Sequence, residues 1–319
     1  MAGSGKAYKV MNPFEETPPP PQEPDPPSEK PASPEEAGPG PLTPLDDFPA
    51  ISTGQLPPTP ALRGYPPDLQ ISWSWHHLIV FLVFIFISIL SVQTVFFALY
   101  APHQKMTADQ FELYMLSKPQ VAIGSTVAIY ALLLFFLYVT LALLRGQPFW
   151  STLGWRKILP KGDGQPRQPI IYFFTGCCLS LLVFALTSVI QAPENTPIEQ
   201  VFKFKQTAML FVATAVLIAP LAEETIFRGY LYPMFARWFG VLPSIVITGV
   251  LFGLMHGPQL GGAKSLIAVM SLVGIVFTVV RARTGSVFAS YLMHLGYNSL
   301  IGASLVLATH GFTQAPTNH

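Results

Sequence analysis

Long runs of apolar residues, separated by short polar connections, make up most of the chain beyond Trp73. About 20 such residues are enough for an α-helix to cross the hydrocarbon core of a bilayer. By this criterion we predict seven spans, at residues 76–100, 121–144, 170–190, 207–236, 242–260, 264–281 and 286–308. The fifth and sixth are the least distinct, because glycine and proline interrupt the apolar pattern between residues 257 and 262. The expected fold is an all-α polytopic membrane protein, a bundle of about seven transmembrane helices.

Residues 1–70 lack this pattern and contain 19 of the 32 prolines of the chain. A segment of this composition buries too little apolar surface to offset the entropy cost of ordering, so we expect a disordered cytoplasmic arm. Its run of four prolines at 18–21 suits a proline-binding domain, although a plain tether is the simpler interpretation. The spans set the other boundaries: two transmembrane helices and a basic connection at 71–169, a membrane domain at 170–308 and a tail at 309–319.

Charge supports this division and limits the classes of function. Residues 1–70 contain 10 of the 17 acidic residues, and residues 71–319 contain only seven. The formal net charge of +1 gives no basic surplus for nucleic-acid binding, and two cysteines exclude a disulfide framework. Connections on one side of the predicted bundle carry eight basic residues against five on the other. This bias favours a multi-pass cell-membrane protein with its N-terminus in the cytoplasm.

Two carboxylates, Glu223 and Glu224, lie within a predicted span together with Arg228. A charged group at the bilayer centre costs about 3 kcal/mol even on insertion scales, so such residues face protein or a wet cavity. Glu224 and Arg228 are four residues apart and can form an ion pair on one helix face. Glu223 is rotated by about 100° and has no partner on its own helix, which makes it the stronger candidate for chemistry. The alternative is a second structural ion pair with another helix.

Of the seven histidines, only His256 and His294 lie well inside apolar runs, and Asn298 shares a helix face with His294. A carboxylate and an imidazole can activate water, while a second imidazole and an amide can donate hydrogen bonds to an oxyanion. That combination predicts hydrolysis of an acyl bond. Glu223, His256 and His294 also match the three protein ligands of a catalytic zinc site. The residues alone permit both readings.

In these segments the chain resembles the membrane-embedded CAAX-processing protease and bacteriocin-processing family, also called the CPBP or Abi family. Its motifs EExxxR, FxxxH and HxxxN match residues 223–228, 252–256 and 294–298, in that order and each on a predicted span. The resemblance covers residues 170–308 and leaves the proline-rich arm outside.

The resemblance implies an intramembrane endopeptidase of the CAAX-processing type, with a peptide or membrane-protein substrate that reaches the site from the cytoplasm or laterally from lipid. Glu223 would activate the hydrolytic water together with His256. His294 and Asn298 would bind the substrate carbonyl or its oxyanion. The family is described as a metalloprotease, in which Zn²⁺ is the expected ion, and alternatively as a metal-free glutamate protease, so both mechanisms stay open.

By the same resemblance, Glu224 and Arg228 would support the site as a pair that fixes the helix. Two other classes of function remain as alternatives. One is a non-enzymatic scaffold or bacteriocin-immunity factor that uses the polar residues and the arm to bind partners. The other is a proton-coupled carrier, for which the sequence shows no internal repeat. An endopeptidase requires Glu223 for cleavage, whereas a scaffold does not.

Overall fold

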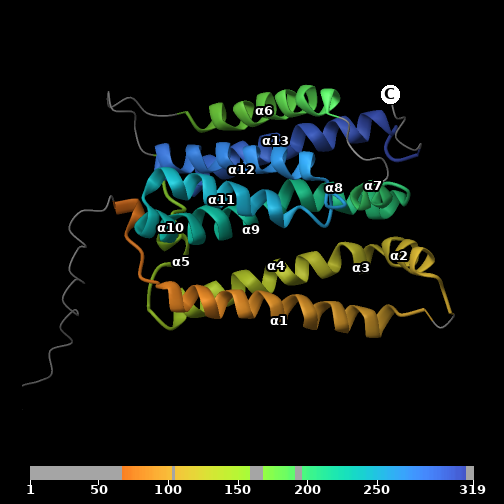
Figure 1. Cartoon of the computed structure of the whole chain (residues 1–319), viewed down its shortest axis with the longest axis horizontal. Coiled ribbons are helices and arrows are strands. Elements are labelled where there is room, and N and C mark those ends of the chain that lie inside the picture. The colour runs from red at the N-terminus through yellow and green to blue at the C-terminus, as the bar shows by residue number, and fades with distance from the viewer. Residues whose placement is uncertain (1–66, 103–104, 159–167, 191–195, 314–319) are drawn as a thin grey trace, which may run out of the picture. The chain divides into compact units, whose positions relative to one another are not determined.

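The computed structural model describes residues 67–102, 105–158, 168–190 and 196–313, apart from the side chains of Ala108, Asp109 and Glu112. In this part of the chain every regular element is a helix, as Figure 1 shows, so the all-α prediction is confirmed. The described residues all belong to one compact unit. Nearly all of the predicted arm and the end of the predicted tail lie outside the described residues.

Each predicted span coincides with a helical segment. The first span is α1 (Trp75–Tyr100), and the third is α6 (Pro169–Val189). The second consists of α3 (Pro119–Ala122), α4 (Gly124–Leu137) and the π-helical η2 (Tyr138–Leu143). The fourth consists of α8 (Lys205–Leu217), α9 (Ala219–Glu224), the π-helical η3 (Thr225–Leu231) and α10 (Tyr232–Phe239). The last three are α11 (Val241–Met255), α12 (Lys264–Thr284) and α13 (Val287–Ala308). Short helices occupy connections: η1 (Pro67–Leu69), α2 (Ala108–Leu116), α5 (Phe149–Thr152) and α7 (Pro197–Val201).

Five helical segments of the described chain are long and apolar enough to cross a membrane: Trp75–Tyr100, Pro119–Leu143, Pro169–Val189, Lys205–Phe239 and Lys264–Thr284. The helix α11 has only 15 residues and ends at Met255, earlier than the predicted residue 260. At 1.5 Å per residue it reaches about 22 Å, less than the roughly 30 Å of hydrocarbon. Large apolar side chains on the outside of the bundle, such as Phe86 at 69% exposure and Phe184 at 74%, suit contact with lipid. These are the features of a multi-pass membrane protein.

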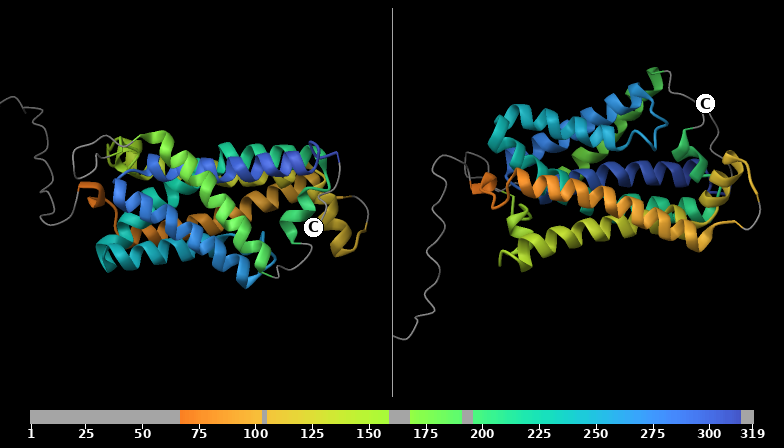
Figure 2. Two further views of the ribbon diagram at one scale, coloured as in Figure 1. Left: turned by 90° about the horizontal axis from the view of Figure 1, so that it is seen from above. Right: turned by 60° about the horizontal axis from the view of Figure 1, so that its bottom comes forward.

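Glycines allow two helix pairs to pack with their backbones in contact. A Cβ atom on Gly274 of α12 would lie 2.7 Å from the backbone oxygen of Gly249 in α11. Gly176 of α6 and Gly296 of α13 approach the facing helix so closely that a Cβ atom on either would collide with its backbone. Small residues serve this purpose in membranes, where helix association depends on close packing. Figure 2 shows these helices from two further directions, with α1 and α4 alongside each other.

Residues 67–70, which their composition places in the arm, are folded against the bundle. The carboxylate of Asp68 lies 3.0 Å from Nη1 of Arg281 in α12, whose side chain is 1% exposed. Leu69 is buried in a small apolar cluster with Tyr232 of α10. The predicted end of the arm at residue 70 is therefore wrong by a few residues, because Asp68 supplies the opposite charge that a buried arginine requires.

Candidate active site

The carboxylates lie in the middle of the fourth span, where the helix changes its geometry twice. Pro220 stands in the first turn of α9 and has no amide hydrogen for a regular helical bond. Near this break, the carbonyl oxygen of Ala215 accepts a 2.7 Å hydrogen bond from Nδ2 of Asn298. The seven residues that follow Glu224 form the π-helical η3, a wider coil that is frequent at functional sites. Such irregular backbone is tolerated in membranes where protein or a cavity surrounds it.

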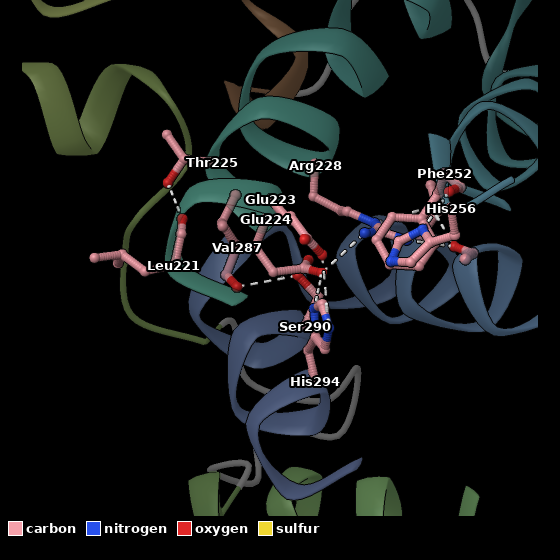
Figure 3. Close-up of polar contacts among 12 residues, drawn as sticks. Leu221, Glu223, Glu224, Thr225, Arg228, Phe252, His256, Val287, Ser290 and His294 are labelled. Atoms are coloured by element: carbon pink, nitrogen blue, oxygen red, sulfur yellow. Dashed lines mark hydrogen bonds and ion pairs between the residues drawn. The ribbon is translucent and has the colours of Figure 1, made fainter. Parts of the chain in front are cut away.

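Glu224 and Arg228 form the expected ion pair. Nη1 of Arg228 lies 2.8 Å from Oε1 of Glu224, and both side chains are fully buried. Arg228 also donates from Nη2 to the carbonyl of Gly274 at 2.7 Å and from Nε to Oγ1 of Thr278 at 3.2 Å, both on α12. Its guanidinium lies 4.6 Å from the ring centroid of Phe252 and points toward this ring in Figure 3. Arg228 therefore ties the carboxylate-bearing helix to α11 and α12.

Glu223 finds its partners on other helices. The hydroxyl of Tyr130 on α4 donates a 2.5 Å hydrogen bond to Oε1 of Glu223. The other oxygen, Oε2, lies 3.9 Å from Nε2 of His294, which is beyond hydrogen-bond distance. Two atoms at this separation can both lie about 2.8 Å from a single oxygen atom placed beside them. The phenol thus orients the carboxylate and leaves Oε2 available to a reacting oxygen atom.

His294 projects from α13 toward both carboxylates, as Figure 3 shows. Its Nδ1 is 3.0 Å from Oε1 of Glu224, and a carboxylate oxygen accepts, so Nδ1 carries the hydrogen. The ring stacks on Phe277 of α12 with a centroid distance of 4.7 Å. These contacts fix the imidazole on both sides and direct Nε2 toward Glu223.

His256 follows the last residue of α11. Its Nδ1 lies 2.8 Å from the carbonyl oxygen of Phe252, one turn earlier. Because a carbonyl only accepts, Nδ1 is the donor, and Nε2 of the neutral ring is a hydrogen-bond acceptor. No direct hydrogen bond joins His256 to Glu223, two side chains that the structure describes in full. If the two side chains activate water together, the water molecule must therefore lie between them and contact both.

One cavity of about 490 Å³ brings the site residues together. Its wall includes Tyr130, Glu223, His256, His294 and Asn298. Most other side chains of the wall are apolar, among them Ile123, Phe211, Val216, Ile301 and Leu305. Glu224 and Arg228 are not part of the wall. Glu223 therefore lines the cavity, whereas Glu224 and Arg228 form a buried ion pair that supports the site.

The described side chains of the site are not arranged as three ligands of one metal ion. Among the residues that the structure describes, no three His, Cys, Asp or Glu side chains are grouped so that they could hold a metal ion. In particular, Glu223, His256 and His294 do not converge as zinc ligands in this conformation. The zinc site stays a prediction, and the mechanism proposed below contains no step at a metal.

Among the contacts that residues outside the motifs make at the site are three side-chain hydrogen bonds. Tyr130 belongs to α4, and Thr278 belongs to α12. Nε1 of Trp155 donates a 3.0 Å hydrogen bond to Oγ1 of Thr225, the first residue of η3. Single Tyr, Thr and Trp residues in or beside apolar runs carry little signal, since most of them pack without a catalytic partner. Only the lack of a partner for Glu223 on its own helix indicated that another helix had to supply one.

Comparisons with known proteins bear on the same segment. Residues 205–300, which contain all three motifs, match the family model described as "Type II CAAX prenyl endopeptidase Rce1-like". An Escherichia coli protein described as "Uncharacterized 24.3 kDa protein" is 31% identical over 126 residues, an alignment that covers 37% of this chain and 55% of that protein. The chain thus spans about half the length of this curated relative, and no solved structure matches it. The resemblance inferred from the motifs is confirmed to this extent: residues 205–300 are similar to the Rce1-like CAAX prenyl endopeptidase family.

Proposed function

We propose that this protein is an intramembrane endopeptidase of the CAAX-processing type, in which Glu223 and His256 activate water for hydrolysis of a peptide bond. The observation that carries the proposal is the shared cavity: Glu223, His256, His294 and Asn298 come from three separate motifs and line one mostly apolar space of about 490 Å³. A structural ion-pair network would have no need of these four polar groups on a cavity wall.

The nucleophile in this proposal is a water molecule whose proton passes to Glu223. Glu223 lines the cavity, and Tyr130 holds its Oε1 and leaves Oε2 without a hydrogen bond to protein. His256 presents an acceptor nitrogen, Nε2, to the same cavity and can take part in holding the water. Removal of a proton by the carboxylate leaves hydroxide character on the oxygen that attacks the carbonyl carbon. The C–N bond then breaks, and the leaving amine takes the proton from Glu223.

His294 and Asn298 are suited to the carbonyl side of the reaction. A protonated His294 donates from Nδ1 to Glu224 and from Nε2 into the cavity, toward the oxygen that becomes negative. Together with Arg228, its positive charge would also balance the negative charges of Glu223 and Glu224. Asn298 uses one amide hydrogen on the carbonyl of Ala215 and retains a second for the substrate.

The apolar wall indicates what kind of substrate fits. A peptide bond beside Glu223 would have its neighbouring groups in contact with side chains such as Phe211 and Ile301. Apolar side chains or an attached lipid would be buried there, whereas charged residues would lose hydration. Together with the family description, this favours a membrane-associated peptide with a prenylated CAAX sequence as the first substrate to test.

The position of the cavity bears on the route of entry. Its wall reaches Pro197 at the start of α7 and Pro258–Leu260 after α11. These connections lie at the end of the bundle opposite to the start of α1, as Figure 1 shows. With the N-terminal arm in the cytoplasm, that end is extracytoplasmic. Entry from the cytoplasm, as expected from the sequence, would therefore require the opposite orientation of the bundle, whereas lateral entry from lipid fits either orientation.

The decisive test is cleavage by the purified chain in lipid nanodiscs. Fluorogenic peptides ending in a CAAX sequence, with and without a farnesyl group, would be compared for the wild type, Glu223→Gln and His256→Ala. Both substitutions are expected to abolish cleavage while expression and thermal melting stay close to the wild type. Cleavage retained by both variants would refute the proposal.

A second experiment identifies the natural substrate without assuming prenylation. Peptide termini in membranes are compared between cells that express the wild type and cells that express Glu223→Gln. New C-termini that depend on Glu223 would name the substrate. Identical termini, combined with an unchanged cellular phenotype of the variant, would favour the non-enzymatic scaffold.

A further inference from the structure

A short segment outside the family match, Leu153–Arg156, contacts both helices that carry the site. On the first side it touches η3, which continues from the carboxylates. Leu153 is fully buried, and its carbonyl oxygen would lie 2.7 Å from a Cβ atom on Gly229, so this contact depends on glycine. Trp155 donates its 3.0 Å hydrogen bond to Thr225, which directly follows Glu224.

On the second side the segment holds the start of α13, the helix that carries His294. The carbonyl oxygen of Gly154 accepts a 2.9 Å hydrogen bond from the backbone nitrogen of Val287, the first residue of α13. The carbonyl oxygen of Arg156 accepts a 2.5 Å hydrogen bond from Oγ of Ser286. Four consecutive residues thus connect the helix of Glu223 and Glu224 to the helix of His294.

A basic pocket of about 460 Å³ opens beside this segment. Among the described residues, its wall is lined by Trp155, Arg156, Lys157, Ile158, Pro169 and Phe288. The described residues of the wall include two cationic side chains and no carboxylate. Nε of Arg156 is buried without a hydrogen-bond partner, and in the described part of the chain neither cation forms an ion pair with a carboxylate. Two cations without opposite charge, around an open space, favour an anionic ligand.

The pocket lies where membrane spans begin. Pro169 is the first residue of α6, and the residues that follow expose Ile170 and Phe174 at 58% and 60%. Trp150 is half exposed and contacts Trp155 edge to face at a centroid distance of 5.6 Å. Tryptophan and basic side chains at the end of a span are typical of the headgroup level of a bilayer, and basic pockets between helices bind lipid phosphates there.

We propose that this pocket binds the phosphate group of an anionic membrane phospholipid, with Arg156 and Lys157 as its cationic contacts. The phosphate would lie against the two cations and the acyl chains along the exposed apolar surface of α6. A bound headgroup would hold Leu153–Arg156 in place and thereby stabilise the approach of η3 to α13. The ligand site is thus coupled to the catalytic helices through main-chain contacts and the Trp155–Thr225 hydrogen bond.

The test uses the full chain and phosphatidylglycerol as the probe. Native mass spectrometry in mixed micelles would compare retention of phosphatidylglycerol and phosphatidylcholine, and thermal melting would be recorded in nanodiscs with rising phosphatidylglycerol content. We expect the wild type to retain phosphatidylglycerol about tenfold more strongly and to melt several degrees higher with it. The double variant Arg156→Gln/Lys157→Gln, which keeps every main-chain contact, is expected to lose both effects.

Three controls make the result specific. Lys203→Gln removes an exposed lysine outside the pocket and should behave as the wild type, while Lys157→Arg should retain binding. Inorganic phosphate added to phosphatidylcholine nanodiscs should not reproduce the stabilisation; if it does, the ligand is a soluble phosphate and the lipid proposal is wrong. Equal lipid preference in the double variant also overturns it. None of these measurements depends on peptidase activity, so their outcome is independent of the proposed function.

Discussion

The hydroxyl of Tyr130 lies 2.5 Å from Oε1 of Glu223, although the two residues are 93 positions apart in the chain. Tyr130 belongs to α4, and the segment that matches the family begins only at residue 205. The first two spans therefore do more than add length to the membrane domain. One of them contributes a hydrogen-bond donor that sets the direction of the candidate catalytic carboxylate.

Replacing Tyr130 by Phe removes only this donor and should lower kcat. A hydrogen bond to a charged group contributes about 1.5–3 kcal/mol, which corresponds to roughly a 10- to 100-fold loss of rate if the orientation of Glu223 matters in the transition state. KM should change little, because the apolar wall that would bind substrate is kept. Steady-state cleavage of a fluorogenic peptide in nanodiscs measures both constants.

The matched control for this substitution is Tyr138→Phe in η2. Tyr138 contacts the ring of Phe149 and is not part of the cavity wall, so it should keep wild-type kcat. A Tyr130→Phe variant with unchanged kcat, or with its loss confined to KM, would show that the hydrogen bond does not position Glu223 for chemistry.

The parts of the structure that could be predicted from the sequence are those that depend on local pattern. Apolar length located each span, and the spacing of Glu224 and Arg228 anticipated an ion pair that has the expected geometry. The spacing of His294 and Asn298 likewise placed both on one helix face, which lines the cavity. These features require knowledge of one helix only.

Features that depend on which helices are neighbours could not be predicted. Asp68 meets Arg281 across 213 residues, and nothing in the composition near Asp68 distinguishes it from the other acids of the arm. The hydrogen bond of Asn298 to Ala215 exists because the fourth span breaks near Pro220, and the break became visible only in the structure. A buried charge in a sequence indicates that a partner exists without saying where it is.

Arg228→Lys is expected to destabilise the protein despite its conserved charge. An ammonium group cannot reach Glu224, Gly274 and Thr278 in the planar geometry that the guanidinium uses. Weakening a buried pair leaves part of the charge of Glu224 uncompensated, and the full loss of a partner costs about 3–5 kcal/mol. Thermal melting in detergent should fall by several degrees, whereas Lys203→Arg, at an exposed position after α7, should not change it. Equal melting of the two variants would contradict the supporting role of Arg228.

Gly274→Ala should loosen the contact between α11 and α12 and disturb the site as well. The new methyl group would lie 2.7 Å from the backbone oxygen of Gly249, and backbone cannot move aside as a side chain can. Overpacking of this kind costs about 1–3 kcal/mol. Because the carbonyl of Gly274 accepts from Arg228, activity should fall together with stability. Gly124→Ala is the control, since its Cβ would meet only the ring of Phe96 at 3.3 Å, and a wild-type melting curve for Gly274→Ala would refute the argument.

Cleavage is expected to survive exhaustive treatment with a metal chelator. Nδ1 of His256 is engaged by the carbonyl of Phe252 and Nδ1 of His294 by Glu224, and Glu223, His256 and His294 do not form a metal-holding group in the described structure. Activity before and after dialysis against chelator would be compared with a zinc endopeptidase handled in the same way. Loss of activity that returns on addition of zinc alone would show that the three side chains rearrange into a metal site.

Asp68→Asn should lower stability even though Asp68 lies before the first span. The substitution removes the negative charge that pairs with Arg281, whose side chain is 1% exposed, and it leaves an uncompensated guanidinium inside the bundle. Loss of one partner from a buried pair costs about 3–5 kcal/mol, although the 15% exposure of the Asp68 side chain lowers the expected value toward the small end. Differential scanning fluorimetry would compare it with Glu199→Gln, a carboxylate that is exposed on α7. If Asp68→Asn melts like the control, residues 67–70 do not contribute to the fold as their contacts indicate.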